Sequence, residues 1–463
     1  MLSFVVSALA CVFAALCYAE FASMVPVAGS AYTYAYATLG ELFAWIIGWD
    51  LILEYAVASS TVAHAWSHYF QDFIGLLGLK LPHVLTNAPF DYDPHVGRLL
   101  ATGTWLDLPA IVIAAAVTVV LVIGIRESVG FNAAMVIVKL VIVLFVIAVG
   151  SFYVNPQNWQ PFAPYGLTGV SFFGKTLFGQ TGAGGEPLGM LAGAAVIFFA
   201  YIGFDSVSTH AEEAKNPRRD VPIGIIVSLI LCTVLYIAVA AVITGMVPYD
   251  QINIDAPVSN AFGRVGLPWA QFLISIGALT GITSVLLVMM LSQPRVFLAM
   301  ARDGLLPESF FGAVHERFRT PWKGTILTGC FVATLGAFVP LRILADLVNI
   351  GTLLAFVIVC AAVLIMRRTN PDAERPFRAP FAPLTPILGI ALCLLLMFSL
   401  PPENWLRLAV WLLIGILIYI FYGRHHSVMA RSLAHEVSKH GVSPAGMPVT
   451  HTGVPPDDQP PGR

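Results

Sequence analysis

The sequence predicts an all-α integral membrane protein, and two observations predict it. Hydrophobic residues make up 58% of the 463 residues and charged residues 11%, against about 25% charged in an ordinary soluble domain. Apolar runs of about 20 residues, the length of a helix that crosses a bilayer, recur along the chain. The net charge of −2 gives no indication of a nucleic-acid partner.

The apolar runs predict eleven membrane-spanning helices. Pro26 and Gly29 separate the first two, and the second is long enough to be tilted or to extend beyond the lipid. Residues 423–463 are polar and proline-rich and are predicted to form a disordered tail. The predicted spans are residues 2–24, 30–66, 107–125, 130–153, 189–213, 222–246, 266–300, 323–340, 344–366, 382–400 and 404–422.

The basic residues predict the orientation. They are concentrated in one set of loops, around Arg218, Arg302 and Arg368, and in the tail. The positive-inside rule makes these loops and the C-terminus cytoplasmic. Eleven spans then place residue 1 outside, although no secretory signal stands at the start. One more helix in front would put both ends in the cytoplasm.

Three ionisable residues stand out within the predicted spans, where insertion of a charge costs roughly 2.5–3.5 kcal/mol. Lys139 is near the middle of its span, too deep to snorkel easily, and is interpreted as an amine that gains and loses a proton. Glu54 lies one turn after Asp50 on the same helix face. It is either satisfied by neighbouring helices or part of a site. Asp205, after Gly203, either caps a restarted helix or serves a site.

The segment 200–205 has the composition of a broken helix: a glycine, a capping acid and flanking aromatic residues. An unwound turn at mid-bilayer leaves backbone N–H and C=O groups that can hold the ammonium and carboxylate groups of a substrate. Aromatic runs in membrane helices also arise from packing alone.

Other polar residues give weaker indications. The six cysteines lie in apolar runs and are interpreted as buried hydrophobic residues. His64 and His68 have a spacing that can bind metal, but they fit an interfacial aromatic belt better, so no metal site is expected. Ser284 is interpreted as a small-residue helix contact. No phosphate-binding loop, dinucleotide fingerprint or nucleophile elbow is present, and no cofactor is expected.

Five segments closely resemble bacterial amino acid permeases of the APC superfamily, in the cationic amino acid transporter branch. The likeness covers about residues 1–423. The segments are CYAEFASMVPVAGSAYTYAYATLGELFAWIIGWDLILEY (17–55), YIGFDSVSTHAEEAKNPRRDVPIGI (201–225), PRVFLAMARDGLLPESFFGAVHERFRTPWKGT (294–325), DLVNIGTLLAFVIVC (346–360) and RPFRAPFAPLTPILG (375–389).

The resemblance implies a LeuT-type fold of two five-helix inverted repeats followed by two further helices. Residues 1–153 match an incomplete first repeat, 189–366 the second repeat and 382–422 the extra helices. The family's first helix, with its glycine-rich break that holds the substrate carboxylate, has no match. Either the natural chain begins earlier, which we favour, or the product is a fragment.

The resemblance also implies roles for the site residues. Phe199 matches a gating aromatic residue, and the carbonyl groups of Phe199, Ala200 and Ile202 match those that receive the substrate's ammonium group. Asp205 and Glu54 match acids beside the substrate, and Lys139 matches a lysine that takes part in proton coupling.

The implied function is proton-coupled secondary active transport of a cationic or neutral amino acid by alternating access, in the bacterial inner membrane. The implied partners are the amino acid, the proton and the lipid bilayer. The alternative is a transport-inactive truncated permease that acts only as a membrane partner or sensor. A membrane-embedded enzyme is disfavoured because too few polar residues share one membrane depth.

Overall fold

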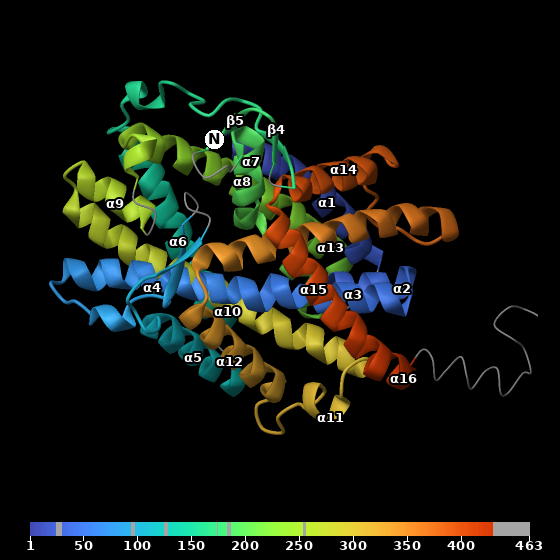
Figure 1. The fold of residues 1–463 in the computed structure, drawn as a ribbon. Helices are drawn as coiled ribbons and strands as arrows, with labels where there is room; N and C mark the ends of the chain where they lie inside the picture. The colour runs from blue at the N-terminus through green and yellow to red at the C-terminus, as the bar shows by residue number, and fades with distance from the viewer. Residues whose placement is uncertain are drawn as a thin grey trace, which may run out of the picture.

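The chain folds into a bundle of helices (Figure 1). Besides the main hydrophobic core, buried apolar side chains form two smaller clusters. One lies between α4, α5, α10 and α12, and the other lies between α6, α8, α9 and α10. The computed structural model describes residues 1–24, 30–93, 98–124, 128–173, 175–182, 187–252 and 256–428.

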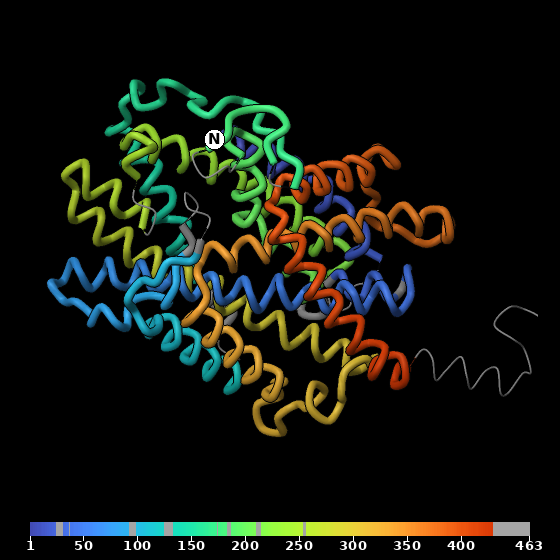
Figure 2. The backbone as a smooth tube through the Cα atoms, in the orientation of Figure 1, coloured from blue at the N-terminus to red at the C-terminus, as the bar shows by residue number. Residues whose placement is uncertain are grey.

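The second predicted span, 30–66, differs from the observed helices. Gly40, with φ of +89°, ends one short helix before the next begins, because a glycine adopts positive φ without a Cβ clash. The following helix then runs without interruption to Leu76 (Figure 2). Its middle is a π-helical turn, a feature frequent at functional sites. The elements are α1 (Leu2–Met24), α2 (Ser30–Thr38), α3 (Glu41–Ile52), η1 (Leu53–Val57) and α4 (Ala58–Leu76).

Each of the other predicted spans also contains a helix. Eight helical segments of the described chain are long and apolar enough to cross a membrane, and two shorter ones are apolar. The helices are α5 (Leu108–Ile123), α6 (Ser128–Ser151), α7 (Met190–Ile197), α8 (Pro217–Met246), α9 (Pro257–Arg264), α10 (Pro268–Arg302), α11 (Glu308–Phe311), α12 (Trp322–Phe338), α13 (Leu341–Thr369), α14 (Leu384–Ser399), α15 (Pro402–Ile418) and α16 (Arg424–His426). Shorter helical turns are η2 (His83–Leu85), η3 (Pro156–Trp159), η4 (Phe198–Tyr201), η5 (Asp205–Glu213), η6 (Tyr249–Gln251) and η7 (Tyr419–Gly423).

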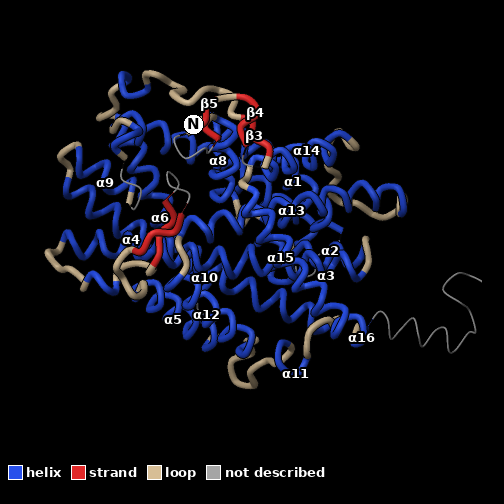
Figure 3. The backbone as a smooth tube through the Cα atoms, viewed as in Figure 1, coloured by secondary structure: helices blue, strands red, loops and turns tan. Residues whose placement is uncertain are grey.

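Short strands, which the sequence reasoning did not predict, occur in the loops (Figure 3). They form three antiparallel two-stranded pairs. Pairing satisfies backbone groups that a loop would otherwise leave to water. The strands are β1 (Phe90–Asp93), β2 (Arg98–Ala101), β3 (Val170–Phe172), β4 (Lys175–Phe178), β5 (Gln180–Thr181) and β6 (Pro187–Leu188).

The helix predicted over 189–213 is broken. The α-helix α7 tightens into η4, the chain is extended at Ile202, and helical structure resumes at Asp205. Gly203 has a φ of +113°, which side-chain-bearing residues rarely adopt. A Cβ added there would lie 2.9 Å from Met289 Cε, so the glycine also permits close packing against α10.

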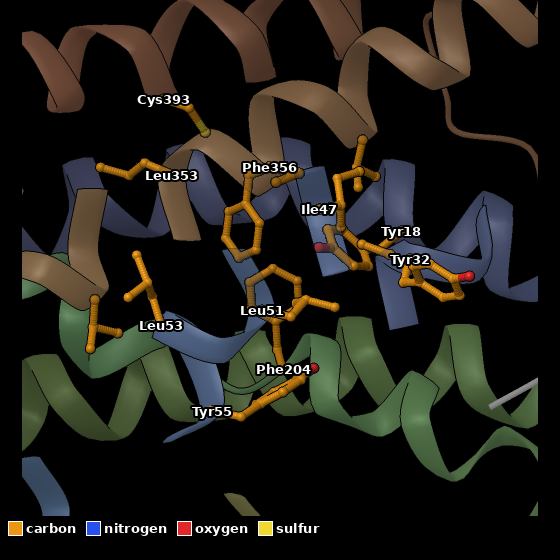
Figure 4. Packing of buried hydrophobic residues seen from close by; sticks show 14 of the residues in the cluster. Tyr18, Tyr32, Ile47, Leu51, Leu53, Tyr55, Phe204, Leu353, Phe356 and Cys393 are labelled. Atoms are coloured by element: carbon orange, nitrogen blue, oxygen red, sulfur yellow. The ribbon is translucent and has the colours of Figure 1, made fainter. Parts of the chain in front are cut away.

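Aromatic side chains from distant segments pack beside this break (Figure 4). Phe204 contacts Phe356 with ring centroids 5.0 Å apart, and Tyr18 lies edge-on to both rings. The break is therefore enclosed by protein on this side, as membrane-embedded irregular backbone requires.

The C-terminal helix extends beyond its predicted end at residue 422. It continues through η7 into α16, and the chain then returns to the bundle. Ser427 Oγ donates a hydrogen bond to Glu41, and Val428 N donates to Asp303 O at 3.0 Å. Residues 423–428, which were assigned to the predicted tail, thus belong to or contact the bundle, and residues 429–463 lie outside the described chain.

A buried carboxylate joins α1 to the basic end of α13. Glu20 is fully buried and accepts hydrogen bonds from Arg367 at 3.0 and 2.5 Å and from Ala379 N at 2.8 Å. Arg375 Nε lies 3.4 Å from the same carboxylate, and its side chain is only 4% exposed. Two-pronged arginine pairing with this many donors compensates for removal of the charge from water.

We predict that Glu20→Ala lowers the free energy of unfolding by about 3–5 kcal/mol, because it leaves the buried Arg375 without its counter-charge. Thermal unfolding of the detergent-solubilised protein measures the loss. Glu374→Ala is the matched control. Its pair with Arg218 is 3.5 Å long and exposed on both sides, so the expected cost is below about 1 kcal/mol. Equal effects of the two substitutions would contradict the assignment.

A second prediction concerns the break. Gly203→Ala forces a side chain into a positive-φ conformation and against Met289, with an expected cost of about 1–3 kcal/mol. Gly224→Ala in α8 is the control, because its new Cβ would meet Val207 at an ordinary 3.5 Å. Unfolding midpoints should separate the two variants. A Gly203→Ala protein as stable as Gly224→Ala would show that the strain is absent.

Candidate functional site

Tyrosine hydroxyls hold the broken segment in place. Tyr236 OH on α8 donates to the Ala200 carbonyl oxygen at 2.8 Å, and Tyr201 OH donates to the Phe4 carbonyl oxygen at 2.9 Å. Ile202 N donates to the Phe199 carbonyl oxygen at 3.3 Å. Two of the three carbonyl groups that the resemblance assigned to the substrate's ammonium group, those of Phe199 and Ala200, thus already accept a hydrogen bond. A carbonyl oxygen keeps a second lone pair for another donor.

Asn349 on α13 supports the helix just before the break. Its Nδ2 donates to the carbonyl oxygens of Ala195 and Val196 at 3.1 and 3.3 Å. These carbonyl groups lie at the C-terminal end of α7, where the regular helical pattern changes. The amide therefore satisfies backbone groups that a helix end leaves without partners. The sequence reasoning did not single out Asn349.

On one side of the break, the structure brings Glu54 and Asp205 together. Both are fully buried, with exposures of 1% and 0%, and the two carboxyl groups lie close enough to interact electrostatically. Tyr55 OH donates to Asp205 Oδ2 at 2.5 Å. A buried carboxyl group needs hydrogen-bond donors or another group that offsets the loss of water.

The two acids differ in the donors around them. Asp205 accepts a hydrogen bond from Tyr55, and donors stabilise a carboxylate. Glu54 has no hydrogen-bond partner within the described chain. Asp205 is therefore the better stabilised of the two carboxyl groups. Asp50, one turn earlier, is likewise buried, and its Oδ1 lies close to Gly351 on α13.

On the other side, the break lines a cavity of about 270 Å³. This size is slightly below that of pockets for drug-sized ligands, about 300–1,000 Å³. Lys139 from α6 reaches the same cavity. Among the described residues that line it, Lys139 is the one with a charged side chain. The lining residues that matter here are Lys139, Ala200, Ile202, Gly203, Ser284 and Met289.

Lys139 contacts α10. Its Nζ donates to Ser284 Oγ at 3.2 Å, and Ser284 Oγ in turn donates to the Gly281 carbonyl oxygen at 2.8 Å. A Cβ on Gly281 would lie 3.1 Å from Lys139 Cδ, so the glycine makes room for the lysine stem. Ser284 is thus more than a helix-packing residue. The sequence carries no local signal for a pair 145 positions apart.

The predicted site residues therefore fall into two groups. Ala200, Ile202 and Lys139 line the cavity, whereas Glu54 and Asp205 are buried and are not among its lining residues. Phe199 is half-buried and packs against the main core. The broken segment thus contributes both to an apolar cavity with one amine and to a buried acid pair.

Comparisons with known proteins show which proteins this chain is similar to. A family model described as amino acid permease matches residues 1–421. The chain is 49% identical to the branched-chain amino acid permease BcaP of Bacillus subtilis (strain 168), over 92% of this chain and 86% of that protein. It is 44% identical to the methylthioribose transporter of the same organism, over 93% and 87% of the two chains. It is 32% identical to the vacuolar cationic amino acid transporter 4 of Arabidopsis thaliana, over 92% and 86%.

A chain of apolar helices with a broken segment beside a central cavity has the architecture of a membrane transporter rather than an enzyme. The family match extends over nearly all of the described residues. The chain therefore belongs to the amino acid permease family of multi-pass membrane transporters.

Proposed function

We propose that this chain carries out proton-coupled secondary transport of a neutral amino acid by alternating access. The observation that carries the proposal is the shared cavity of the unwound turn and Lys139. The turn supplies backbone groups for the substrate's charged ends. The lysine supplies a group whose charge changes with one proton.

Coupling follows from the position of Lys139. An ammonium group in a largely apolar cavity is costly, and among the described residues Ser284 is the one that accepts a hydrogen bond from it. A zwitterionic substrate brings a carboxylate that offsets this charge. Binding of the proton therefore strengthens binding of the substrate, and the reverse, so a coupling free energy links the two ligands. Binding of both ligands changes the equilibrium between the outward-facing and inward-facing forms of the protein.

The cavity chemistry favours a neutral substrate over a cationic one. A cationic side chain would meet the like charge of Lys139, and Glu54 and Asp205 are not among the residues that line the cavity. Val136, Leu229 and Val288 instead offer apolar surface. The 49% identity to a protein named a branched-chain amino acid permease supports an aliphatic side chain.

The basic loops support an orientation with the C-terminus in the cytoplasm. The similarity to two proteins of Bacillus subtilis supports a bacterial cytoplasmic (inner) membrane as the location.

We predict that Lys139→Met abolishes stimulation of uptake by a proton gradient, because the side chain keeps its length and loses its charge. The expected loss is at least about tenfold, within the usual range of coupling free energies. Uptake of radiolabelled leucine into proteoliposomes, with and without an inward proton gradient, measures it. Substrate counterflow without a gradient reports whether the protein still transports.

Val138→Met is the matched control, because this neighbouring side chain is 43% exposed and can accommodate methionine without a change of charge. It should behave as the unmodified protein does. If Lys139→Met retained gradient-driven uptake, the proposal that Lys139 couples transport to the proton would be wrong.

Competition measures the substrate class. Excess unlabelled leucine or valine should reduce leucine uptake strongly, and arginine should reduce it little. Glu54→Gln should retain uptake and leave this preference unchanged, because Glu54 is not among the residues that line the cavity. Strong competition by arginine that disappears in Glu54→Gln would instead assign Glu54 to a cationic substrate side chain.

A further inference from the structure

A cluster of three metal-binding residue types lies away from the transport cavity, at the end of α4 opposite the basic loops. His64 and His68 are one turn apart on α4, and Asp107 immediately precedes α5. One potential ligand atom from each residue lies within 4.8 Å of the others. We infer that these three residues form a binding site for a divalent transition metal, with zinc as the preferred ion.

Asp107 provides an oxygen aimed at the histidines. The residue is fully buried, and its Oδ1 accepts hydrogen bonds from Ser67 Oγ at 2.6 Å and from Ala110 N at 3.1 Å. Its Oδ2 lies 3.1 Å from His64 Nδ1 but accepts no well-aligned hydrogen bond from the described residues. A buried carboxylate oxygen without such a bond is costly, and a cation at this point would remove the cost.

The neighbours of the cluster hold its members in position. His64 Nδ1 lies 3.1 Å from the Gly336 carbonyl oxygen as well as from Asp107. Asp107 N donates to the Ala337 carbonyl oxygen at 3.2 Å, which attaches the start of α5 to the end of α12. When His64 Nδ1 donates its proton to the Gly336 carbonyl oxygen, Nε2 is the ring nitrogen that can bind an ion. Hydrogen bonds of this kind orient the ligands in metal sites.

The cluster is accessible from one side. His68 is half-buried and lines a polar cavity of about 280 Å³, together with Gln71, Asp72, Asn87 and Asn260. A hydrated ion can therefore reach His68 through the cavity, and a water molecule there can complete the coordination. A path for entry and a fourth ligand are both requirements of a functional site.

The ligand set favours zinc over magnesium or calcium. Two imidazole nitrogens with one carboxylate oxygen suit zinc, whereas magnesium and calcium prefer oxygen ligands alone. Tetrahedral bonds of about 2.0–2.2 Å place the ligand atoms about 3.3 Å apart. The widest separation must therefore shorten by roughly 1.5 Å, which rotation of the half-buried His68 ring can provide.

The histidine pair by itself favoured an interfacial aromatic role, and the rings are indeed in contact, with centroids 4.8 Å apart. The third ligand changes the interpretation. Asp107 is separated from His64 by 43 positions and from Ser67 by 40, so no short sequence motif contains all three ligands. A bound ion would fasten α4 to α5, and α4 continues the helix that carries Glu54.

The experiment uses the detergent-purified protein without a histidine tag and zinc chloride alone as the probe. Competition with a chromophoric zinc chelator measures affinity and stoichiometry, and cobalt chloride reports geometry through its visible absorption. We expect one zinc ion per chain and the absorption of tetrahedral cobalt. His68→Gln should weaken zinc binding by more than about 100-fold, because even substitutions outside the ligand set cost 10–100-fold.

His83→Gln is the matched control, because this exposed histidine lies near the same face but outside the cluster. It should bind zinc as the unmodified protein does. Zinc should also raise the unfolding temperature of the unmodified protein and not that of His68→Gln. Unchanged binding in His68→Gln, or no stoichiometric binding to the unmodified protein, would show that the cluster is only a polar cap on α5. Both outcomes are independent of transport activity.

Discussion

The structure depends on the covering of one unwound turn, Ile202–Phe204, inside a helical bundle. No water in the hydrocarbon core can satisfy a free backbone group, so a break in a membrane helix persists only where protein surrounds it. Here the Tyr236 hydroxyl donates a hydrogen bond to the Ala200 carbonyl oxygen, and the Asn349 side chain donates to a carbonyl oxygen at the end of α7. Phe204 packs between aromatic rings from α1 and α13. Helices distant in sequence are thereby held around the same turn.

Two polar environments of different character adjoin the turn. Glu54 and Asp205 are buried, and Asp205 accepts a hydrogen bond from Tyr55. Lys139 faces a cavity, where its ammonium group has few partners. The charge of Lys139 can be removed by loss of a proton or offset by a substrate, so the cavity can respond to both ligands. The acid pair instead stabilises the turn, through the hydrogen bond between Tyr55 and Asp205.

The bundle has several further polar connections between helices. Glu20 joins α1 to α13, and Glu41 contacts Tyr419 and Ser427 near the C-terminal helix. Asp107 joins α5 to α4 and α12. In lipid, apolar side chains alone give little preference for one helix neighbour over another, so buried polar pairs contribute specificity.

The sequence by itself determined the helical, membrane-spanning class and the position of the broken helix. The length of an apolar run and a glycine followed closely by an acid are local properties, so they can be recognised in the sequence alone. Only the tertiary structure decided that Ser284 partners Lys139, that Glu54 meets Asp205 away from the cavity, and that Asp107 joins His64 and His68. It also decided the helix end at Leu76 and the break at Gly40. Such pairings depend on how separate helices pack, and no local pattern in a single sequence records that packing.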